Sequence, residues 1–218
     1  SWLHLHLVKV KEGRLEKAPV EAIIDSKRRN NIRRNHSVTH LLHRALKDVL
    51  GSHVNQAGSL VMADRMRFDF SHFDAMTKEE IAEVEKRVNE KIFEGLPVET
   101  KITGLEEAKE MGLFEGKYQD QVRVLSMGDY SRELCGGTHV SNTSEISMFK
   151  ILSESGISNG VRRIESITGP AVYEYLNNLS EKEEKIASEL KSNKDEIIQK
   201  IKLNIKNLKE ANKAIEKL

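Results

Sequence analysis

The chain has 218 residues, of which 32% are charged and 5% aromatic, and its formal net charge is +1. No apolar run approaches the ~20 residues needed to cross a bilayer, which excludes a membrane-spanning protein. Cys135 is the only cysteine, so a disulfide scaffold is excluded and a reducing, cytoplasmic setting is expected. Near-zero net charge does not exclude nucleic-acid binding, because local patches of positive charge determine whether a protein binds nucleic acid. The first residue is Ser1 rather than Met, so we expect a piece of a longer protein.

The first 170 residues predict a mixture of helices and short strands. Residues 20–25 look like a strand. Asn35 predicts the N-cap of a helix from His36 to Leu50, which Gly51 would end. Further strands are predicted at residues 59–70 (one bent strand or two), 97–103, 122–127, 147–153 and 162–168. A helix is predicted after the capping-box pattern at 77–80, and a short helix at 105–111 before Gly112. We therefore expect an α+β fold in which helices cover an antiparallel sheet.

The composition changes near residue 170, beyond which the chain has no further Gly or Pro. Pro170 suits the first position of a helix, whose amide has no helical partner in any case. Apolar residues then recur mostly at gaps of three, four and seven as far as Leu218. This pattern predicts a long C-terminal α-helix or coiled coil, through which two copies could form a homodimer. The alternative is a solvated helix that packs on nothing else in the chain.

His36 and His40 are four residues apart on the predicted helix, one turn above the other. This spacing lets both rings reach one ion at the ~2.1 Å of a Zn–N bond. His43 falls near the same face, so the periodicity alone does not choose the pair. Zinc proteases carry Glu after the first His, where this chain has Ser37, so that class is excluded. Taken alone, two histidines at this spacing are more often a solvated helix face.

A second cluster, Cys135-Gly-Gly-Thr-His139, supplies a thiolate and an imidazole, both suited to zinc. The two glycines allow a tight turn that brings backbone amides close to a ligand. This cluster alone is a weak signal, and a Cys–His nucleophilic pair is an alternative. Together with His36 and His40, however, it completes four ligands of the type that zinc prefers, two on a helix and two in a later loop.

Five segments then carry a resemblance to a known family. They are residues 35–43, 56–59, 67–70, 128–140 and 160–165. In this order they resemble the editing domain of alanyl-tRNA synthetase, a fold shared with threonyl-tRNA synthetase editing domains and free-standing alanyl-tRNA editing proteins. The resemblance implies that residues 1–30 end a preceding β-rich, barrel-like segment, that 31–169 form the editing domain, and that 170–218 begin a helical linker.

The resemblance also implies roles for individual residues. It implies that zinc is held by His36, His40, Cys135 and His139, and that the catalytic residues are Gln56 in the amino-acid pocket with Gly136, Gly137 and Thr138 near the ester. Backbone amides of the glycine turn could stabilise an oxyanion. Asp129 and Glu133 could accept hydrogen bonds that fix a histidine tautomer.

The implied reaction is hydrolysis of the ester on tRNA(Ala) that wrongly carries serine or glycine. A pocket shaped for the methyl group of alanine rejects the added hydroxyl of serine only ~10²-fold. A second site that selects by size alone cannot remove both wrong amino acids, because serine is larger than alanine and glycine is smaller. Zinc could activate a water, but four protein ligands fill its tetrahedron, so we expect it to anchor or orient the substrate. The rival hypotheses are a free-standing editing protein and a zinc-stabilised tRNA-binding or dimerising module without activity.

Five cations lie in residues 27–34, just before the predicted metal helix. Such a run is usually a solvated face. Beside the acceptor end of tRNA, it would neutralise phosphates. Two further arginines on a strand suggest the same role, although strand neighbours point to opposite faces and at most one would serve. The predicted tRNA contacts are Arg28, Arg29, Arg33, Arg34, Arg162 and Arg163.

Overall fold

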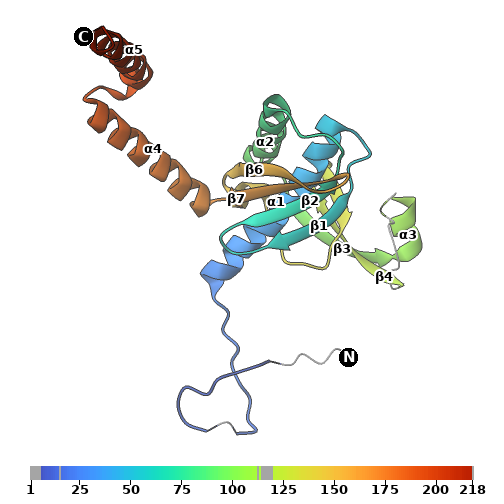
Figure 1. The fold of residues 1–218 in the computed structure, drawn as a ribbon. Coiled ribbons are helices and arrows are strands. Elements are labelled where there is room, and N and C mark those ends of the chain that lie inside the picture. Colours follow the sequence, from blue (N-terminus) through green and yellow to red (C-terminus); the bar gives the residue numbers. More distant parts are fainter. Residues whose placement is uncertain (1–5, 15, 112, 114–119, 218) are drawn as a thin grey trace.

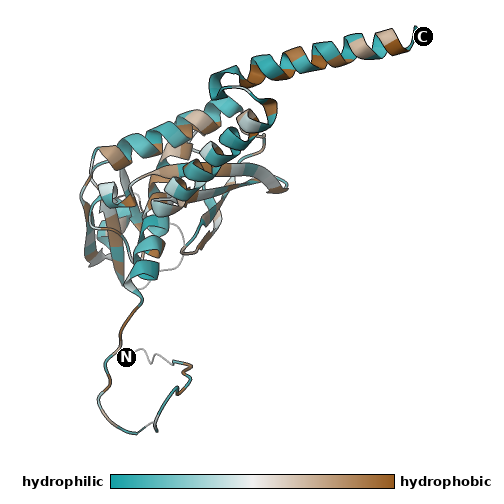
Figure 2. Ribbon diagram, turned by 90° about the vertical axis from the view of Figure 1, so that its left-hand side faces the viewer, coloured by the Kyte–Doolittle hydropathy of each residue, from teal (hydrophilic) through white to brown (hydrophobic). Residues whose placement is uncertain are grey.

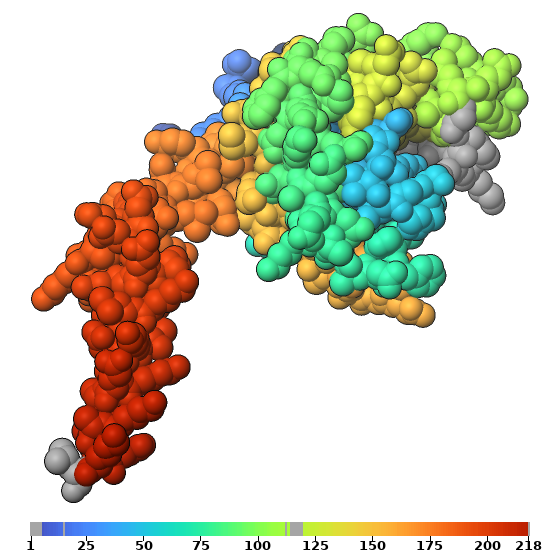
Figure 3. All heavy atoms as spheres, turned by 90° about the horizontal axis from the view of Figure 1, so that it is seen from above, coloured from blue at the N-terminus to red at the C-terminus, as the bar shows by residue number. Residues whose placement is uncertain are grey.

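The structure is a computed structural model that describes residues 6–14, 16–111, 113 and 120–217 (Figure 1). The predicted helix end at Gly112 lies outside the described residues, as do six positions of the segment 1–30. Two antiparallel sheets and two long helices form a body, and two further helices project from it as an arm (Figures 1 and 3). The α+β class is confirmed, with two sheets in place of the single sheet that we expected.

The larger sheet is antiparallel throughout, with its strands in the order β1-β2-β7-β6. The strands are β1 (Gln56–Val61), β2 (Met66–Ser71), β7 (Val161–Thr168) and β6 (Phe149–Ser158). Phe68 lies opposite Ile164, and Asp69 opposite Arg163. Because side chains alternate along a strand, Phe68 and Ile164 share one face of the sheet, whereas Asp69 and Arg163 share the other.

A smaller sheet has the order β3-β4-β5. Its strands are β3 (Val98–Gly104), β4 (Gln121–Met127) and β5 (Ser131–Leu134), and α3 (Leu105–Glu110) follows β3. The sequence did not predict β5, because four residues are too few to show alternation. This short strand leads directly into the Cys-Gly-Gly-Thr-His motif.

Two helices, α1 (Ser26–Leu50) and α2 (Lys78–Phe93), pack against each other and against the apolar face of the larger sheet. The predicted capping box is confirmed, since Thr77 Oγ1 accepts from the Glu80 amide at 3.1 Å and Glu80 accepts from the Thr77 amide at 2.8 Å. The core between helices and sheet includes Val38, Leu41, Leu42, Phe68, Phe70, Val84, Val88 and Ile164, all completely buried.

The prediction that Asn35 caps the helix is wrong. Helix α1 begins at Ser26, where Asp25 accepts from the Arg28 amide at 2.9 Å. Asn35 is buried inside the helix, donates to the Met62 carbonyl at 2.9 Å and accepts from another side chain. The first turns escaped prediction because their charged residues show no apolar period. The helix end is confirmed, since Gly51 has a φ of +116° and its amide donates to the Lys47 carbonyl.

Residues 20–25 were expected to form a strand and do not. They run in an irregular, exposed path and pair with no described strand. Val20 and Ile23 are 80% and 83% exposed. A strand needs a neighbour for its backbone hydrogen bonds, and the described residues offer none. That residues 1–30 end a β-rich segment stays a prediction.

The arm consists of α4 (Pro170–Leu190), the 3₁₀ turn η2 (Lys194–Glu196) and α5 (Ile197–Ile215). Pro170 begins α4 as expected. The expected continuous helix is interrupted at Lys191, which is left-handed with a φ of +49°, and the Ser and Asn that follow favour turns over helix interiors. Apolar and polar residues alternate along α5 (Figure 2), and none of its residues is buried. Within the described ranges, no helix could cross a membrane.

Candidate metal centre

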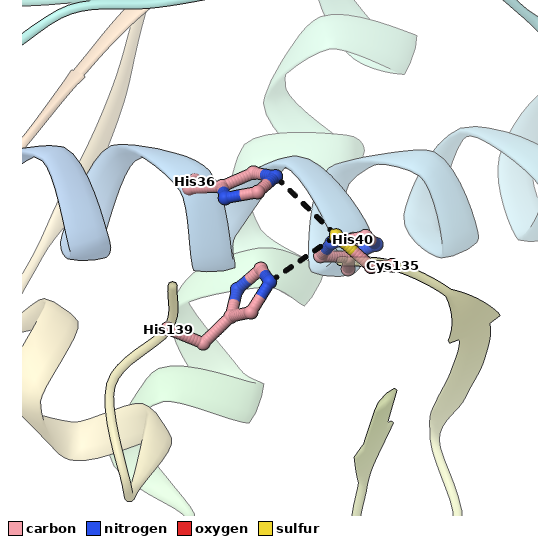
Figure 4. Close-up of side chains that lie close together, drawn as sticks. All are labelled: His36, His40, Cys135 and His139. Carbon is pink, nitrogen blue, oxygen red and sulfur yellow. Dashed lines mark hydrogen bonds between the residues drawn. The ribbon is translucent and has the colours of Figure 1, made fainter. Parts of the chain in front are cut away.

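Helix α1 presents His36 and His40 one turn apart, with their ring centroids separated by 5.6 Å (Figure 4). His40 is buried, with 6% of its surface exposed, and His36 is half-buried. The neighbouring Leu41 and Leu42 are completely buried in the core. This packing fixes the rotation of the helix and therefore the direction in which both imidazoles point.

Cys135 and His139 come from the loop after β5 and approach the two histidines of α1 (Figure 4). The Nδ1 atom of His139 lies 3.2 Å from Ser37 Oγ. The same hydroxyl accepts from the Val140 amide at 3.1 Å. Ser37 stands where a zinc protease would have its Glu, and here it attaches the loop to the helix.

The four predicted ligands converge on one point, because their donor atoms all lie within 4.8 Å of one another. Cys135 Sγ is 3.5 Å from His36 Nε2 and 3.3 Å from His139 Nε2. His40 Nε2 is buried and has no hydrogen-bond partner. An unpartnered buried nitrogen is costly unless a ligand satisfies it. The set of three imidazoles and one thiol therefore fits a metal ion that prefers nitrogen and sulfur.

Glu133 supports this cluster from β5. Its carboxylate accepts from His40 Nδ1 at 2.6 Å and from His43 Nδ1 at 2.8 Å. This contact assigns a proton to Nδ1 of His40 and directs its Nε2 at the cluster, where a metal would take the place of a second proton. The sequence left His43 open as a ligand, and the structure places it on Glu133 instead. Asp129, the other proposed acceptor, makes no such contact in the described part of the chain.

The electrostatics favour a thiolate. Burial raises the pKa of Cys135, but hydrogen bonds from His139 and His36, the nearby His40 ring and the Gly137 amide outweigh it and lower the pKa to about 3. Burial lowers the pKa of His40, whereas interactions with the Cys135 thiolate and the Glu133 carboxylate raise it to about 9. The pKa of His139 is lowered, mainly by burial. The thiolate is the form in which cysteine binds metals.

Three contacts hold the loop that carries the second pair of ligands. Arg123 on β4 donates from Nη1 to the carbonyls of Cys135, at 2.9 Å, and Gly137, at 2.6 Å. Arg33 donates to the carbonyl of His139. A Cβ atom at Gly137 would overlap the His36 ring, whereas one at Gly136 would meet nothing.

The predicted catalytic residues are divided between this loop and a neighbouring cleft. The amide of Gly137 is directed at the Cys135 sulfur, whereas the amides of Gly136 and Thr138 have no acceptor among the described residues. Gln56, at the start of β1, lines a cleft of about 390 Å³ together with His43 and Glu133. Glu133 therefore joins this cleft to the metal cluster.

The predicted tRNA-contacting arginines lie in two places, and four of them bind other parts of the protein. Arg33 and Arg34 of α1 donate to carbonyls of the loop after β5 and of Glu145. Arg162 pairs with Glu154 through two hydrogen bonds of 2.5 and 2.8 Å. Its neighbour on β7, Arg163, makes two hydrogen bonds to Asp69 on the opposite face of the larger sheet. Arg28 and Arg29 lie in the first turn of α1, where Arg28 is exposed and Arg29 is half-buried.

Sequence reasoning missed Arg123 and the structural role of Ser37. An arginine within a strand carries no local signal that it binds the backbone of a loop 12 and 14 residues later. In the sequence, Ser37 indicates only that the Glu of a zinc protease is absent. Neither contact follows from spacing, because both depend on how separate elements pack.

Comparison with known proteins places the chain among aminoacyl-tRNA synthetases. The model of the threonyl and alanyl tRNA synthetase second additional domain matches residues 122–165. The chain is 54% identical over 202 residues to alanine--tRNA ligase of Bacillus cytotoxicus, covering 91% of this chain and 23% of that protein. For the ligases of Acetivibrio thermocellus and Oceanobacillus iheyensis, identity is 51% and 49% over 219 residues, covering 99% of this chain and 25% of each relative.

The chain spans about a quarter of the length of the curated relatives it matches. The family model begins in β4 and ends in β7, so it contains both loop ligands and Glu133. The similarity to the ligase of Oceanobacillus iheyensis extends over nearly the whole chain, and therefore over α1 as well. The resemblance to alanyl-tRNA synthetase is thus confirmed, and this chain corresponds to the part of that enzyme family that contains the second additional domain.

Proposed function

We propose that this chain is the editing module of an alanyl-tRNA synthetase, which hydrolyses the ester of tRNA(Ala) mischarged with serine or glycine. The observation that carries the proposal is the convergence of His36, His40, Cys135 and His139 beside a cleft that contains Gln56. In the reaction, water adds to the ester carbonyl and the bond to the ribose oxygen breaks. The free amino acid and an intact tRNA end are released.

The four clustered side chains would hold one zinc ion. The buried, unpartnered Nε2 of His40 and the lowered pKa of Cys135 support a bound cation over an empty polar cluster. A zinc ion held there would supply a fixed positive charge beside the ester.

The protein's own groups would bind and orient the substrate. Gln56 offers an amide donor and acceptor in the cleft, suited to a serine hydroxyl. The amides of Gly136 and Thr138, which lack acceptors in the described chain, could donate to the developing oxyanion. Gly137 would act differently, because its amide holds the Cys135 sulfur and its missing side chain makes room for His36.

The test is deacylation of Ser-tRNA(Ala), Gly-tRNA(Ala) and Ala-tRNA(Ala) by the chain. We expect release of serine and glycine well above the uncatalysed rate, with Ala-tRNA(Ala) largely spared. His40→Ala should abolish the activity and lower the zinc content. His72→Ala is the matched control, because the His72 ring lies outside the cluster, where it bonds to His53 at 2.9 Å and stacks on Phe70.

Equal, background-level hydrolysis of all three substrates by a zinc-loaded chain would contradict editing. That result would favour the inactive zinc-stabilised module, which the four-ligand set also allows because such sets are typical of structural zinc. Contact with the acceptor end of tRNA(Ala), a cytoplasmic location and a homodimer through the arm remain predictions. The free-standing editing protein remains the nearest alternative.

A further inference from the structure

The cleft beside the metal cluster has a cationic lining. Besides Gln56 and Glu133, it is lined by Arg44, Lys47 and Arg132. None of these three cations belongs to the basic run in residues 27–34. An enclosed set of cations raises the local concentration of anions more than the same charges spread over a surface.

The charges in this cleft are largely available. Arg44 pairs with Asp48 at 2.8 Å, and half of its side-chain surface stays exposed. Lys47 and Arg132 have no carboxylate partner in the described parts of the chain. Arg162 and Arg163, by contrast, each use two nitrogens on a carboxylate. Lys47 and Arg132 can therefore bind an anion without first breaking an ion pair, and Arg44 keeps exposed nitrogens beside its pair with Asp48.

The cations share their two structural elements with the metal cluster. On α1, His36, His40, Arg44 and Lys47 follow at spacings of four, four and three, so they lie along one side of the helix. On β5, Arg132 directly precedes Glu133, which binds His40. Lys47 therefore lies about 10 Å along the helix axis from His40. A ligand that spans one nucleotide can reach from the cluster to these cations.

We propose that Arg44, Lys47 and Arg132 form a subsite for the phosphodiester on the 5′ side of the substrate's terminal adenosine. The inference rests on the proposed function and adds to it that the site recognises the end of a polynucleotide, not an isolated aminoacyl nucleoside. Phosphate contacts position a nucleic acid without reading its sequence. The subsite would therefore place the ester at the cluster whatever the preceding base is.

The test compares two small substrates, serine esterified to adenosine and serine esterified to cytidylyl-(3′,5′)-adenosine, which differ by one cytidine and the phosphodiester that joins it. We expect the wild-type chain to hydrolyse the dinucleotide ester with a kcat/KM about tenfold higher than that for the adenosine ester. The reason is that hydrogen bonds from the cations of the cleft to a charged phosphate are stronger than bonds between neutral groups. In Lys47→Met and Arg132→Met, the ratio of the two kcat/KM values should fall toward one.

Lys78→Met is the matched control, since Lys78 is an exposed lysine at the start of α2, outside the cleft. It should keep the wild-type ratio. With the full tRNA, log–log plots of kcat/KM against salt should become shallower by ~0.7 for each lost contact. Circular dichroism and zinc content of each variant confirm that it is folded.

The possible failures are distinguishable. A wild-type ratio near one, or a ratio that Lys47→Met and Arg132→Met leave unchanged, overturns the phosphate subsite while editing stands. A wild-type chain that hydrolyses neither the small esters nor mischarged tRNA contradicts the proposed function itself.

Discussion

At the scale of single residues, Gly136 and Gly137 stand side by side between two ligands but face different surroundings. A methyl group at Gly137 would overlap the His36 ring, and a methyl group at Gly136 would meet open space. Neither residue has a φ in the left-handed region, so backbone strain does not distinguish them. The two positions form a natural matched pair.

Gly137→Ala should therefore displace His36 and reduce both zinc content and deacylation at least tenfold, while Gly136→Ala keeps both near the wild-type level. Zinc analysis by mass spectrometry beside a Ser-tRNA(Ala) deacylation assay checks this. Wild-type zinc content and activity in Gly137→Ala would show that His36 does not need its present position, and equal losses in both variants would show that the loop tolerates no added methyl group.

Glu133 provides a second prediction at this scale. Its carboxylate fixes the tautomer of His40, and loss of such a partner typically weakens metal affinity 10–100-fold. Glu133→Gln, which keeps the shape of the side chain, should lower zinc affinity by about this factor in a competition titration with a chelating dye. Glu99→Gln, an exposed carboxylate on β3, is the control. Unchanged affinity in Glu133→Gln would assign its contact to packing alone.

At the scale of elements, α2 supplies hydrogen-bond partners for β6, the edge strand of the larger sheet. Asn89 donates to the Phe149 carbonyl and accepts from the Phe149 amide, both at 2.9 Å. Glu85 accepts from the Ile151 amide at 2.8 Å. Side chains of a helix thus satisfy backbone groups that an edge strand would leave unpaired.

Asn89→Ala should lower the free energy of unfolding by about 1–3 kcal/mol, because two backbone groups of the buried Phe149 lose their partner. Denaturation by urea measures this change. Lys86→Ala, at an exposed position of the same helix, should stay within about 0.5 kcal/mol of wild type. Equal midpoints for both variants would mean that water replaces Asn89 without cost.

How far the sequence predicts the molecule also differs between elements. The clustering of His36, His40, Cys135 and His139 was predictable because their residue types and paired spacing are chemically specific. The end of α1 was predictable because Gly51 is a strong helix stop. The start of α1 was not predictable from the sequence, because the charged turns before Asn35 have no apolar period. The position of β5 and the contacts of Arg123 depend on tertiary packing, which no local pattern records.

At the scale of the whole molecule, the arm and the body are nearly independent. Val172 at the start of α4 is buried and α4 contacts β7, whereas α5 packs on α4 and η2 and has no buried residue. The clustered ligands all lie in the body. Removing α5 should therefore leave the site intact.

A chain ending at Ser192 should keep its zinc content, its deacylation rate on serine-charged dinucleotide and its stability to within about 0.5 kcal/mol. A chain ending at Gly169, which also loses the buried Val172, should be measurably less stable. Differential scanning calorimetry and zinc analysis of the two chains test this division. Loss of zinc from the longer of the two would show that the arm supports the site.

The measurement that tests the central claim most directly is X-ray absorption at the zinc K-edge of the purified chain. The account predicts one zinc per chain, with three nitrogen ligands at ~2.0–2.1 Å and one sulfur at ~2.3 Å. Cys135→Ala should remove the sulfur shell. Absence of zinc from the chain after purification and zinc addition, or a bound zinc whose ligands are all oxygen or nitrogen, would contradict the account.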